Sequence, residues 1–278
     1  MLTLDQFSDT IRHGDYRSPK DHLPREPLGR GFRAWWRFFI SGLLGAIKKG
    51  AALAKAGKLN HREFANLSYS LLNAVESTGC EVSVEGAASL AQLNGRPCVF
   101  VANHMSLIET VVLPCALEAF SPISIIAKRS LSKYPGFNKC LASINPILLD
   151  RKNARHDLAE TLGQGADRLK GGQSVLLFPQ GSRMAVFNPR RFNTLGTKLA
   201  RETGYPLVPV ACKTDFVGIG RIVKDLGPVD PSKPVKFAIG PVLNPSLSQS
   251  ELQQACISFI SEKLTEWGVP CEGAVPQE

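Results

Sequence analysis

From Cys80 onward, short apolar runs that predict β-strands alternate with longer stretches that predict helices. The predicted strands lie at residues 81–85, 98–103, 123–127, 147–149, 174–178, 207–212 and 235–239. The predicted helices lie at 106–117, 154–169 and 194–202, in a stretch after residue 130 that is interrupted at 135–136, and after a capping box at 248–251. Strands that alternate with helices usually form a mainly parallel central sheet flanked by helices, so the pattern predicts an α/β domain over residues 79–278.

The first 78 residues have a different pattern and form a separate predicted domain. Residues 1–30 have the loop composition of an irregular arm. Residues 31–49 combine two Trp and three Phe with flanking Arg and Lys, and Arg37 interrupts an apolar run that falls short of the ~20 residues of a membrane-spanning helix. We expect a helix here that pairs with a second helix, over about residues 60–75, as a helical hairpin.

Two positions of this hairpin fit its composition. In the first, the helix lies in the membrane interface, with Trp at headgroup depth and its cations toward anionic lipid. In the second, it is an amphipathic helix packed on the protein's own core. The interfacial position predicts a peripheral or monotopic protein on the cytoplasmic face of the inner or plasma membrane. The N-terminus has no basic region before an apolar core and does not resemble a secretory signal.

The formal net charge of +9, from 33 basic and 24 acidic residues, predicts an anionic partner. A phosphate-bearing substrate, nucleic acid and an anionic bilayer all satisfy this charge. Nucleic acid is disfavoured because the aromatic residues gather in one apolar stretch and are not interleaved with basic ones. Seven scattered cysteines without a CxxC pair favour reduced thiols in the cytosol, with neither a disulfide scaffold nor a structural metal.

The first candidate site is His104, which follows the apolar run 98–102. Such a run predicts a strand buried on both faces, and sites in open α/β sheets gather at the carboxyl ends of strands. If the next helix begins at Ser106, Glu109 lies in its first turn and can point back toward the imidazole. Residues 106–109 also form a capping box, in which Glu109 would bind the backbone N–H of Ser106 without a catalytic role. Spacing alone does not separate these two roles.

The second candidate site is the turn 179–183, which directly follows the predicted strand 174–178. Its backbone N–H groups and the Arg183 guanidinium can receive an anionic oxygen, with phosphate as the natural candidate. An ordinary turn with a solvated arginine is the alternative. Because both clusters follow strands of one predicted sheet, a shared site is favoured.

Together, residues 104–109 (His-Met-Ser-Leu-Ile-Glu) and 178–183 (Phe-Pro-Gln-Gly-Ser-Arg) resemble the His-x4-Asp and Phe-Pro-Glu-Gly-Thr-Arg signatures of the glycerolipid acyltransferases, the lysophosphatidate acyltransferase family. The order and the separation of the two signatures match. Further blocks that are similar lie at residues 127–129, 149–151, 192–200 and 208–210. The resemblance covers about residues 80–240.

This resemblance implies transfer of a fatty acyl group from acyl-CoA or acyl carrier protein to a lysolipid hydroxyl, most favourably that of 1-acylglycerol-3-phosphate to give phosphatidate. The thioester is a co-substrate, and no cofactor or metal is implied. His104 would act as general base, and Glu109 would hold the other imidazole N–H. The implied substrate-binding residues are Lys128, Arg129, Gln180, Gly181, Ser182 and Arg183.

Three residues depart from the family signatures: Glu109 replaces Asp, Gln180 replaces Glu, and Ser182 replaces Thr. Glu109 adds a methylene, which requires either a more distant backbone or a capping role alone. The neutral Gln180 removes a charge from the expected acceptor site. Other lysolipids, such as a lysophospholipid or an aminolipid, are therefore alternative acceptors. A non-catalytic lipid-binding protein with the same fold is the competing class.

Overall fold

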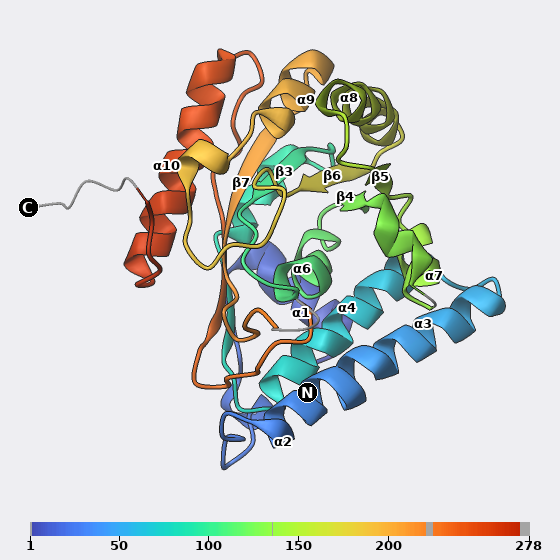
Figure 1. The fold of residues 1–278 in the computed structure, drawn as a ribbon, viewed down its shortest axis with the longest axis vertical. Helices are drawn as coiled ribbons and strands as arrows, with labels where there is room; N and C mark the ends of the chain where they lie inside the picture. Colours follow the sequence, from blue (N-terminus) through green and yellow to red (C-terminus); the bar gives the residue numbers. More distant parts are fainter. Residues whose placement is uncertain (1, 135, 221–224, 273–278) are drawn as a thin grey trace, which may run out of the picture.

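An eight-stranded sheet forms the centre of the computed structural model, which describes residues 2–134, 136–220 and 225–272 (Figure 1). The strands are β1 (Tyr16–Arg17), β2 (Val82–Glu85), β3 (Val99–Ala102), β4 (Ile123–Lys128), β5 (Ile147–Leu149), β6 (Ser174–Leu177), β7 (Leu207–Lys213) and β8 (Val235–Ile239). Their order across the sheet is β1-β2-β8-β7-β3-β6-β4-β5. All neighbours are parallel except β1–β2 and β7–β8. The mainly parallel α/β sheet is therefore confirmed.

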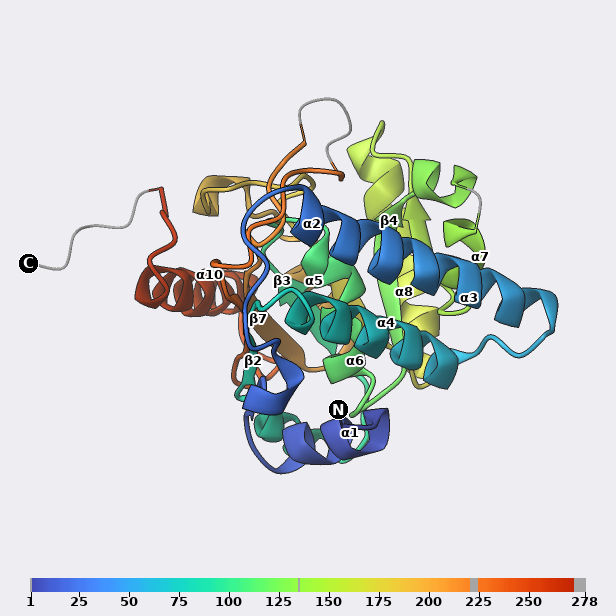
Figure 2. The same cartoon turned by 90° about the horizontal axis from the view of Figure 1, so that it is seen from below.

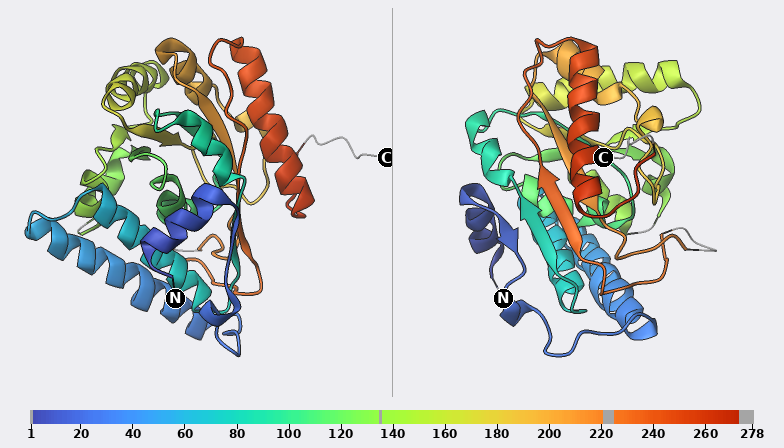
Figure 3. Two further views of the ribbon diagram at one scale, coloured as in Figure 1. Left: turned by 180° about the vertical axis from the view of Figure 1, so that it is seen from behind. Right: turned by 90° about the vertical axis from the view of Figure 1, so that its left-hand side faces the viewer.

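Helices cover both faces of the sheet, and alternate side chains of β3 pack against the helices on the two faces. Val99 and Val101 pack into one apolar cluster with α8 (Ala154–Lys170), α9 (Leu195–Thr203) and α10 (Gln249–Glu266). Phe100 and Ala102 pack into the other cluster, which includes residues of α1 (Leu4–His13), α4 (His61–Glu76), α6 (Leu113–Leu117) and α7 (Phe137–Ala142). Successive side chains of a strand point to opposite faces, so a continuous apolar run is what two covered faces require. Figures 1 and 3 show the two helical layers.

The predicted helical hairpin is confirmed. Its first arm is one continuous helical segment that consists of α2 (Phe32–Trp35), a π-helical stretch over Trp36–Leu44 and α3 (Gly45–Lys55), and its second arm is α4 (His61–Glu76). Figure 2 shows the two arms side by side. A Cβ at Gly42 would lie 2.7 Å from the Ala74 Cβ, so glycine permits the close approach of the arms. Within the described residues, the structure has no helix of sufficient length and apolarity to cross a bilayer.

The prediction of an irregular arm over residues 1–30 is wrong for the first part of this range. Residues Leu4–His13 form helix α1, which a capping box between Thr3 and Gln6 begins. The buried face of α1 carries Leu4, Phe7 and Ile11. The prolines after residue 16 favoured a loop for the whole segment, although residues 4–13 have an amphipathic pattern that follows a capping box. The proposed division into two domains at residue 78 stays a prediction.

The buried carboxylate of Glu76 fastens the segment that follows α1. Glu76 accepts hydrogen bonds from the Tyr16 hydroxyl (2.5 Å), the Ser18 hydroxyl (2.6 Å) and His22 Nδ1 (3.0 Å).

Short 3-10 helices complete the chain at Lys20–His22, Ala87–Leu93, Arg129–Lys133 and Pro189–Arg191. These helices are too short to show a periodic pattern of apolar residues from which they could be predicted. Only the one after residue 128 falls in a predicted helix.

The predicted helix over 106–117 is divided into α5 (Ile108–Val111) and α6 (Leu113–Leu117). Pro114 lies in the first turn of α6, where its missing N–H costs least, and it cannot continue the hydrogen-bond ladder of α5. The capping box between Ser248 and Glu251 begins α10 as predicted. All seven cysteines are free thiols.

Candidate active site

Asn103 sets the point at which the chain leaves the sheet before His104. Its buried side chain donates to the Cys212 carbonyl (2.8 Å) and accepts from the Cys212 N–H (2.7 Å). The side-chain amide of Asn103 thus makes the two hydrogen bonds to β7 that one further peptide unit of β3 would make. The backbone of the next residue can therefore turn away from the sheet, which places His104 at its carboxyl edge.

His104 and Glu109 are in contact. The Nδ1 of His104 lies 2.8 Å from Glu109 Oε1, and the side chains are 13% and 0% exposed, respectively. A carboxylate only accepts hydrogen bonds, so Nδ1 carries the proton and Nε2 of the neutral ring is an acceptor. Nε2 has no hydrogen-bond partner within the described residues. The imidazole also stacks on the Phe178 ring, with 4.5 Å between centroids, which fixes the plane of the ring.

Glu109 makes both of the contacts that the sequence left as alternatives. Besides His104, Oε1 accepts from the backbone N–H groups of Met105 (2.5 Å) and Ser106 (2.8 Å), and Oε2 accepts from the Thr214 hydroxyl (2.6 Å). Burial acts to raise the pKa of this carboxyl, but the hydrogen bonds from His104 and Thr214 and the positive charge of His104 in its protonated form outweigh burial and hold the pKa below its usual value. Glu109 is therefore placed both to cap the turn and to orient the imidazole.

The turn 179–183 has a fixed backbone shape. Gly181 adopts φ +69°, a left-handed conformation that favours glycine, and its N–H donates to the Phe178 carbonyl (3.1 Å). The Asn193 side chain donates to the Pro179 carbonyl, and Arg151 donates to the Gly181 carbonyl. The backbone N–H groups of residues 182 and 183 donate to no group within the described part of the chain. Within the described residues, these two N–H groups are therefore candidate donors to an anionic ligand.

The two candidate clusters are joined directly at the backbone of His104. Gln180 Oε1 accepts from the His104 N–H (2.7 Å), and the Met184 N–H donates to the His104 carbonyl (2.9 Å). The sequence placed Gln180 in the acceptor site, where its neutral amide would remove a charge. The structure places its oxygen against the backbone of His104, and the role of Gln180 toward the substrate stays a prediction.

Arg183 extends from the turn as a largely buried cation. It forms an ion pair with Asp225, and its buried Nε has no hydrogen-bond partner within the described residues. Burial lowers the pKa of the Arg183 guanidinium, and the charge of Glu109 opposes this shift. A buried guanidinium N–H without a partner is unfavourable, so a bound anion would satisfy it. Ser182, by contrast, is exposed.

Lys128 and Arg129 lie at the carboxyl end of β4, which β6 separates from β3. Arg129 donates to Asp150 (3.0 Å) and to the Leu148 carbonyl (2.8 Å), and Lys128 is exposed. No hydrogen bond or ion pair within the described residues joins either cation to His104 or to the turn. Their roles toward substrate stay predictions.

Comparison with known proteins agrees with this geometry. A family model described as "Acyltransferase" matches residues 81–213. The chain is 30% identical over 192 residues to a 1-acyl-sn-glycerol-3-phosphate acyltransferase of Pseudomonas aeruginosa, an alignment that covers 68% of this chain and 70% of that protein. The chain belongs to the acyltransferase family.

Two further matches agree with membership of this family and with the fold. It is 25% identical to the 1-acyl-sn-glycerol-3-phosphate acyltransferase of Escherichia coli over 177 residues, which are 60% of this chain and 67% of that protein. The crystal structure of the 1-acyl-sn-glycerophosphate acyltransferase PlsC from Thermotoga maritima shares its fold, with a TM-score of 0.63, 22% identity and coverage of 85% of this chain and 95% of that chain. The protein is a 1-acylglycerol-3-phosphate acyltransferase-like enzyme of phospholipid biosynthesis.

Sequence reasoning missed four residues that shape the site of this acyltransferase. They are Asn103, Arg151, Asn193 and Thr214. Asn103, Arg151 and Thr214 each lie at or just after the carboxyl end of a predicted strand, and a polar residue there is the signal that could have found them. Asn193 acts through a contact with the turn that precedes it, for which a single sequence carries no signal.

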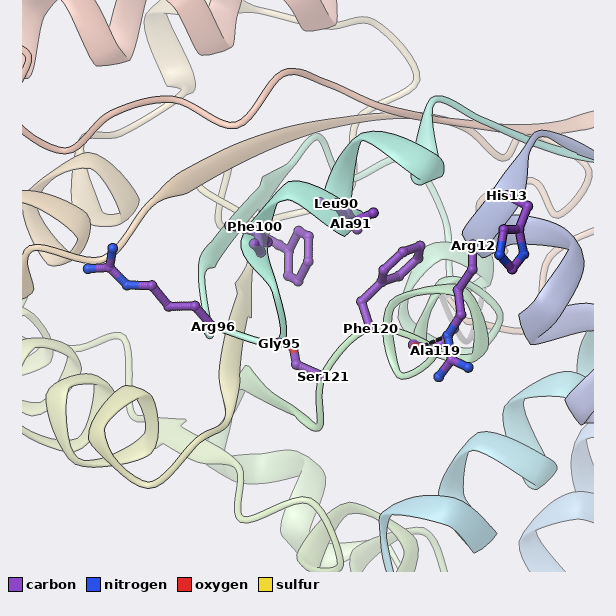
Figure 4. A pocket seen from close by; sticks show the side chains of 11 residues that line it. Arg12, His13, Leu90, Ala91, Gly95, Arg96, Phe100, Ala119, Phe120 and Ser121 are labelled. Atoms are coloured by element: carbon purple, nitrogen blue, oxygen red, sulfur yellow. Dashed lines mark hydrogen bonds between the residues drawn. The ribbon is translucent and has the colours of Figure 1, made fainter.

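A separate cavity lies apart from this site. Its volume is about 350 Å³, and its lining includes Arg12, His13, Arg96, Phe100 and Phe120 (Figure 4). None of the predicted site residues lines it. Within the described residues, no group of three His, Cys, Asp or Glu side chains is arranged to hold a metal ion.

Proposed function

We propose that the acyltransferase moves a fatty acyl group from acyl-CoA or acyl carrier protein to the free hydroxyl of 1-acylglycerol-3-phosphate, with His104 as general base. The observation that carries this proposal is the contact between His104 Nδ1 and the buried Glu109 carboxylate, at 2.8 Å. It leaves Nε2 as the proton acceptor on the accessible side of the ring.

In the first step, His104 Nε2 accepts the proton of the acceptor hydroxyl as that oxygen attacks the thioester carbonyl. Glu109 stabilises the imidazolium that forms, and it keeps the ring in the productive orientation. In the second step, the tetrahedral intermediate collapses, the C–S bond breaks, and the imidazolium returns the proton to the leaving thiolate. The products are the diacyl lipid and a free thiol, so no covalent enzyme intermediate is needed.

The phosphate of the acceptor would bind at the turn 179–183. Within the described residues, Arg183 Nε and the backbone N–H groups of residues 182 and 183 have no hydrogen-bond partner, which supports this placement. Asp225 now neutralises Arg183, and a phosphate would compete with that carboxylate. Lys128 and Arg129 are further candidates for the phosphate or for the developing oxyanion.

A small apolar pocket supports a place for the acyl chain. Its volume is about 50 Å³, and its lining residues are Leu43, Ala46, Ile47, Phe64, Leu67, Ser68, Leu71, Thr110, Val111, Ile125, Phe137, Cys140 and Leu141. Thr110 and Val111 directly follow Glu109 on α5, so the pocket borders the segment that carries the partner of the proposed base. Apolar surface of this kind favours a hydrocarbon chain.

Replacing Arg183 by alanine is expected to raise the KM for 1-acylglycerol-3-phosphate roughly tenfold or more, because a charge-assisted bond to phosphate is lost. The KM for a monoacylglycerol, which lacks the phosphate, should change little. Steady-state kinetics with both acceptors measures the difference. The matched control is Arg201→Ala, which removes an exposed arginine from α9. Equal effects on both acceptors would exclude Arg183 as the phosphate ligand.

We also propose that the first arm of the hairpin binds the membrane surface at the cytoplasmic face. One side of this arm packs Phe38 on the Phe216 ring (5.4 Å between centroids), whereas Phe32 and Trp36 are 72% and 49% exposed. The arm therefore combines a core-packed face with an outward aromatic face. Exposed aromatic side chains on an arm that also carries exposed cations such as Arg33 and Lys48 fit an anionic lipid interface.

The double variant Phe32→Ser/Trp36→Ser is expected to lose most of its binding to vesicles that contain anionic lipid, because each ring buries apolar area in the bilayer. Flotation of the full chain with such vesicles measures this binding. The control is Tyr134→Ser, which removes another exposed aromatic side chain outside the hairpin. Unchanged flotation of the double variant would show that this aromatic face does not hold the protein on lipid.

A further inference from the structure

Thr214 contacts the proposed catalytic pair from a strand that carries neither member. It directly follows β7 and is fully buried. Its hydroxyl oxygen lies 2.6 Å from Glu109 Oε2, and its backbone N–H donates to the Met105 sulfur at 3.3 Å. Thr214 and Glu109 are separated by 105 residues in the chain, so only the folded sheet brings them together.

The direction of this hydrogen bond follows from the ionisation of Glu109. An ionised carboxylate only accepts, so the Thr214 hydroxyl must donate. Oε1 accepts hydrogen bonds from His104 and two backbone N–H groups, and Oε2 accepts hydrogen bonds from two hydroxyl groups. The second of these, from Ser106, lies farther away at 3.2 Å and also accepts from the Ile108 N–H. Thr214 is therefore the shorter donor to Oε2.

We propose that Thr214 is a positioning residue of the acyltransferase, which orients the Glu109 carboxylate and keeps it ionised so that His104 presents an unprotonated Nε2. The inference rests on the proposed role of His104 as general base. Without the hydroxyl, Oε2 would lose its shorter donor in a fully buried environment. The carboxylate would then rotate more freely and bind a proton more readily.

Three titratable side chains bear on the Glu109 carboxylate. His104 donates to it, the Arg183 guanidinium interacts with its charge, and the Cys212 thiol lies on the neighbouring strand. Burial and the Glu109 charge raise the pKa of the Cys212 thiol, so it stays neutral. Loss of the Thr214 hydroxyl removes a donor to the carboxylate, so the pKa of Glu109 should rise and the catalytic defect should grow as the pH falls.

The test compares Thr214→Val with Thr214→Ser in the full-length protein. We expect Thr214→Val to lower kcat roughly tenfold with little change in either KM, and Thr214→Ser to restore most of the activity, because a charge-assisted hydrogen bond is removed and then replaced. The defect in kcat/KM should be larger near about pH 5 than near about pH 8. The matched control is Thr161→Val, since Thr161 is equally buried and its hydroxyl has no hydrogen-bond partner within the described residues.

A double-mutant cycle separates positioning from general destabilisation. If Thr214 acts through Glu109, adding Thr214→Val to Glu109→Gln should cost much less than it costs in the wild-type protein. Additive losses, or a Thr214→Val variant as active as Thr161→Val, would overturn the inference. If His104→Ala itself retains normal activity, the proposed function fails as well, so the two failures are distinguishable.

Discussion

His104→Ala is expected to lower the rate of acyl transfer by about a thousandfold, within the range that a positioned general base contributes. The alanine side chain can neither accept the proton of the acceptor hydroxyl nor return it to the leaving thiolate. Since the proposed phosphate site is separate from the imidazole, the KM for 1-acylglycerol-3-phosphate should change little. Single-turnover assays with a radiolabelled acyl thioester measure the chemical step directly.

Two comparisons keep this result interpretable. His104→Asn places an amide donor near Glu109 but supplies no base, so it should be as inactive as His104→Ala while it preserves more of the buried contacts. His156→Ala removes a histidine from the exposed face of α8 and should leave activity unchanged. Near-normal turnover by folded His104→Ala, with thermal unfolding like that of the wild type, would contradict the mechanism.

Glu109→Gln is expected to slow the reaction roughly a hundredfold or more, because an amide can stabilise the wrong tautomer of the histidine. If the NH₂ group of the introduced glutamine donates to Nδ1, the proton moves to Nε2, which then cannot act as base. A capping residue alone would give a different result, namely an unchanged rate with reduced thermal stability. Measurement of kcat and of the unfolding midpoint on the same preparation separates the two roles.

The same substitution should change how stability depends on pH. The pKa of Glu109 is lower in the folded protein than its ordinary value of 4.5, so its ionised form stabilises the fold above that pH. This contribution is lost as the pH falls from 4.5 through the lowered folded-state pKa. Denaturant unfolding of the wild type should therefore show a steeper loss of stability in this acidic range than Glu109→Gln. Identical slopes would contradict an ionised, hydrogen-bonded Glu109.

The parts of the fold that depend on local pattern could be predicted from sequence. The run before His104 predicts β3 because both faces of that strand are covered, and the capping box at Ser248 predicts the start of α10. Helix α1 shows the limit, since its short amphipathic pattern stood beside proline-rich segments that favoured a loop. The π-helical stretch has a composition that an ordinary α-helix shares, so no pattern distinguishes it.

The candidate site divides in the same way. His104 and Arg183 each follow a buried strand, so their approach is a consequence of parallel topology that a sequence can indicate. The contact of Thr214 with Glu109 and the contact of Asn193 with Pro179 depend on side-chain distances in the folded chain, which one sequence does not encode in any local form. Gln180 was predicted as a site residue, but its contact with the His104 backbone was not, because the shape of the turn decides where its side chain points.

The most direct test incubates the purified wild-type protein with a radiolabelled acyl donor and a panel of lysolipids, and identifies the labelled product. The panel includes 1-acylglycerol-3-phosphate, lysophospholipids with larger headgroups and a monoacylglycerol. The proposed function predicts labelled phosphatidate as the main product, formed with the highest kcat/KM of the panel. Preferred acylation of another lysolipid would contradict the proposed acceptor, and acylation of no member would contradict the proposed reaction.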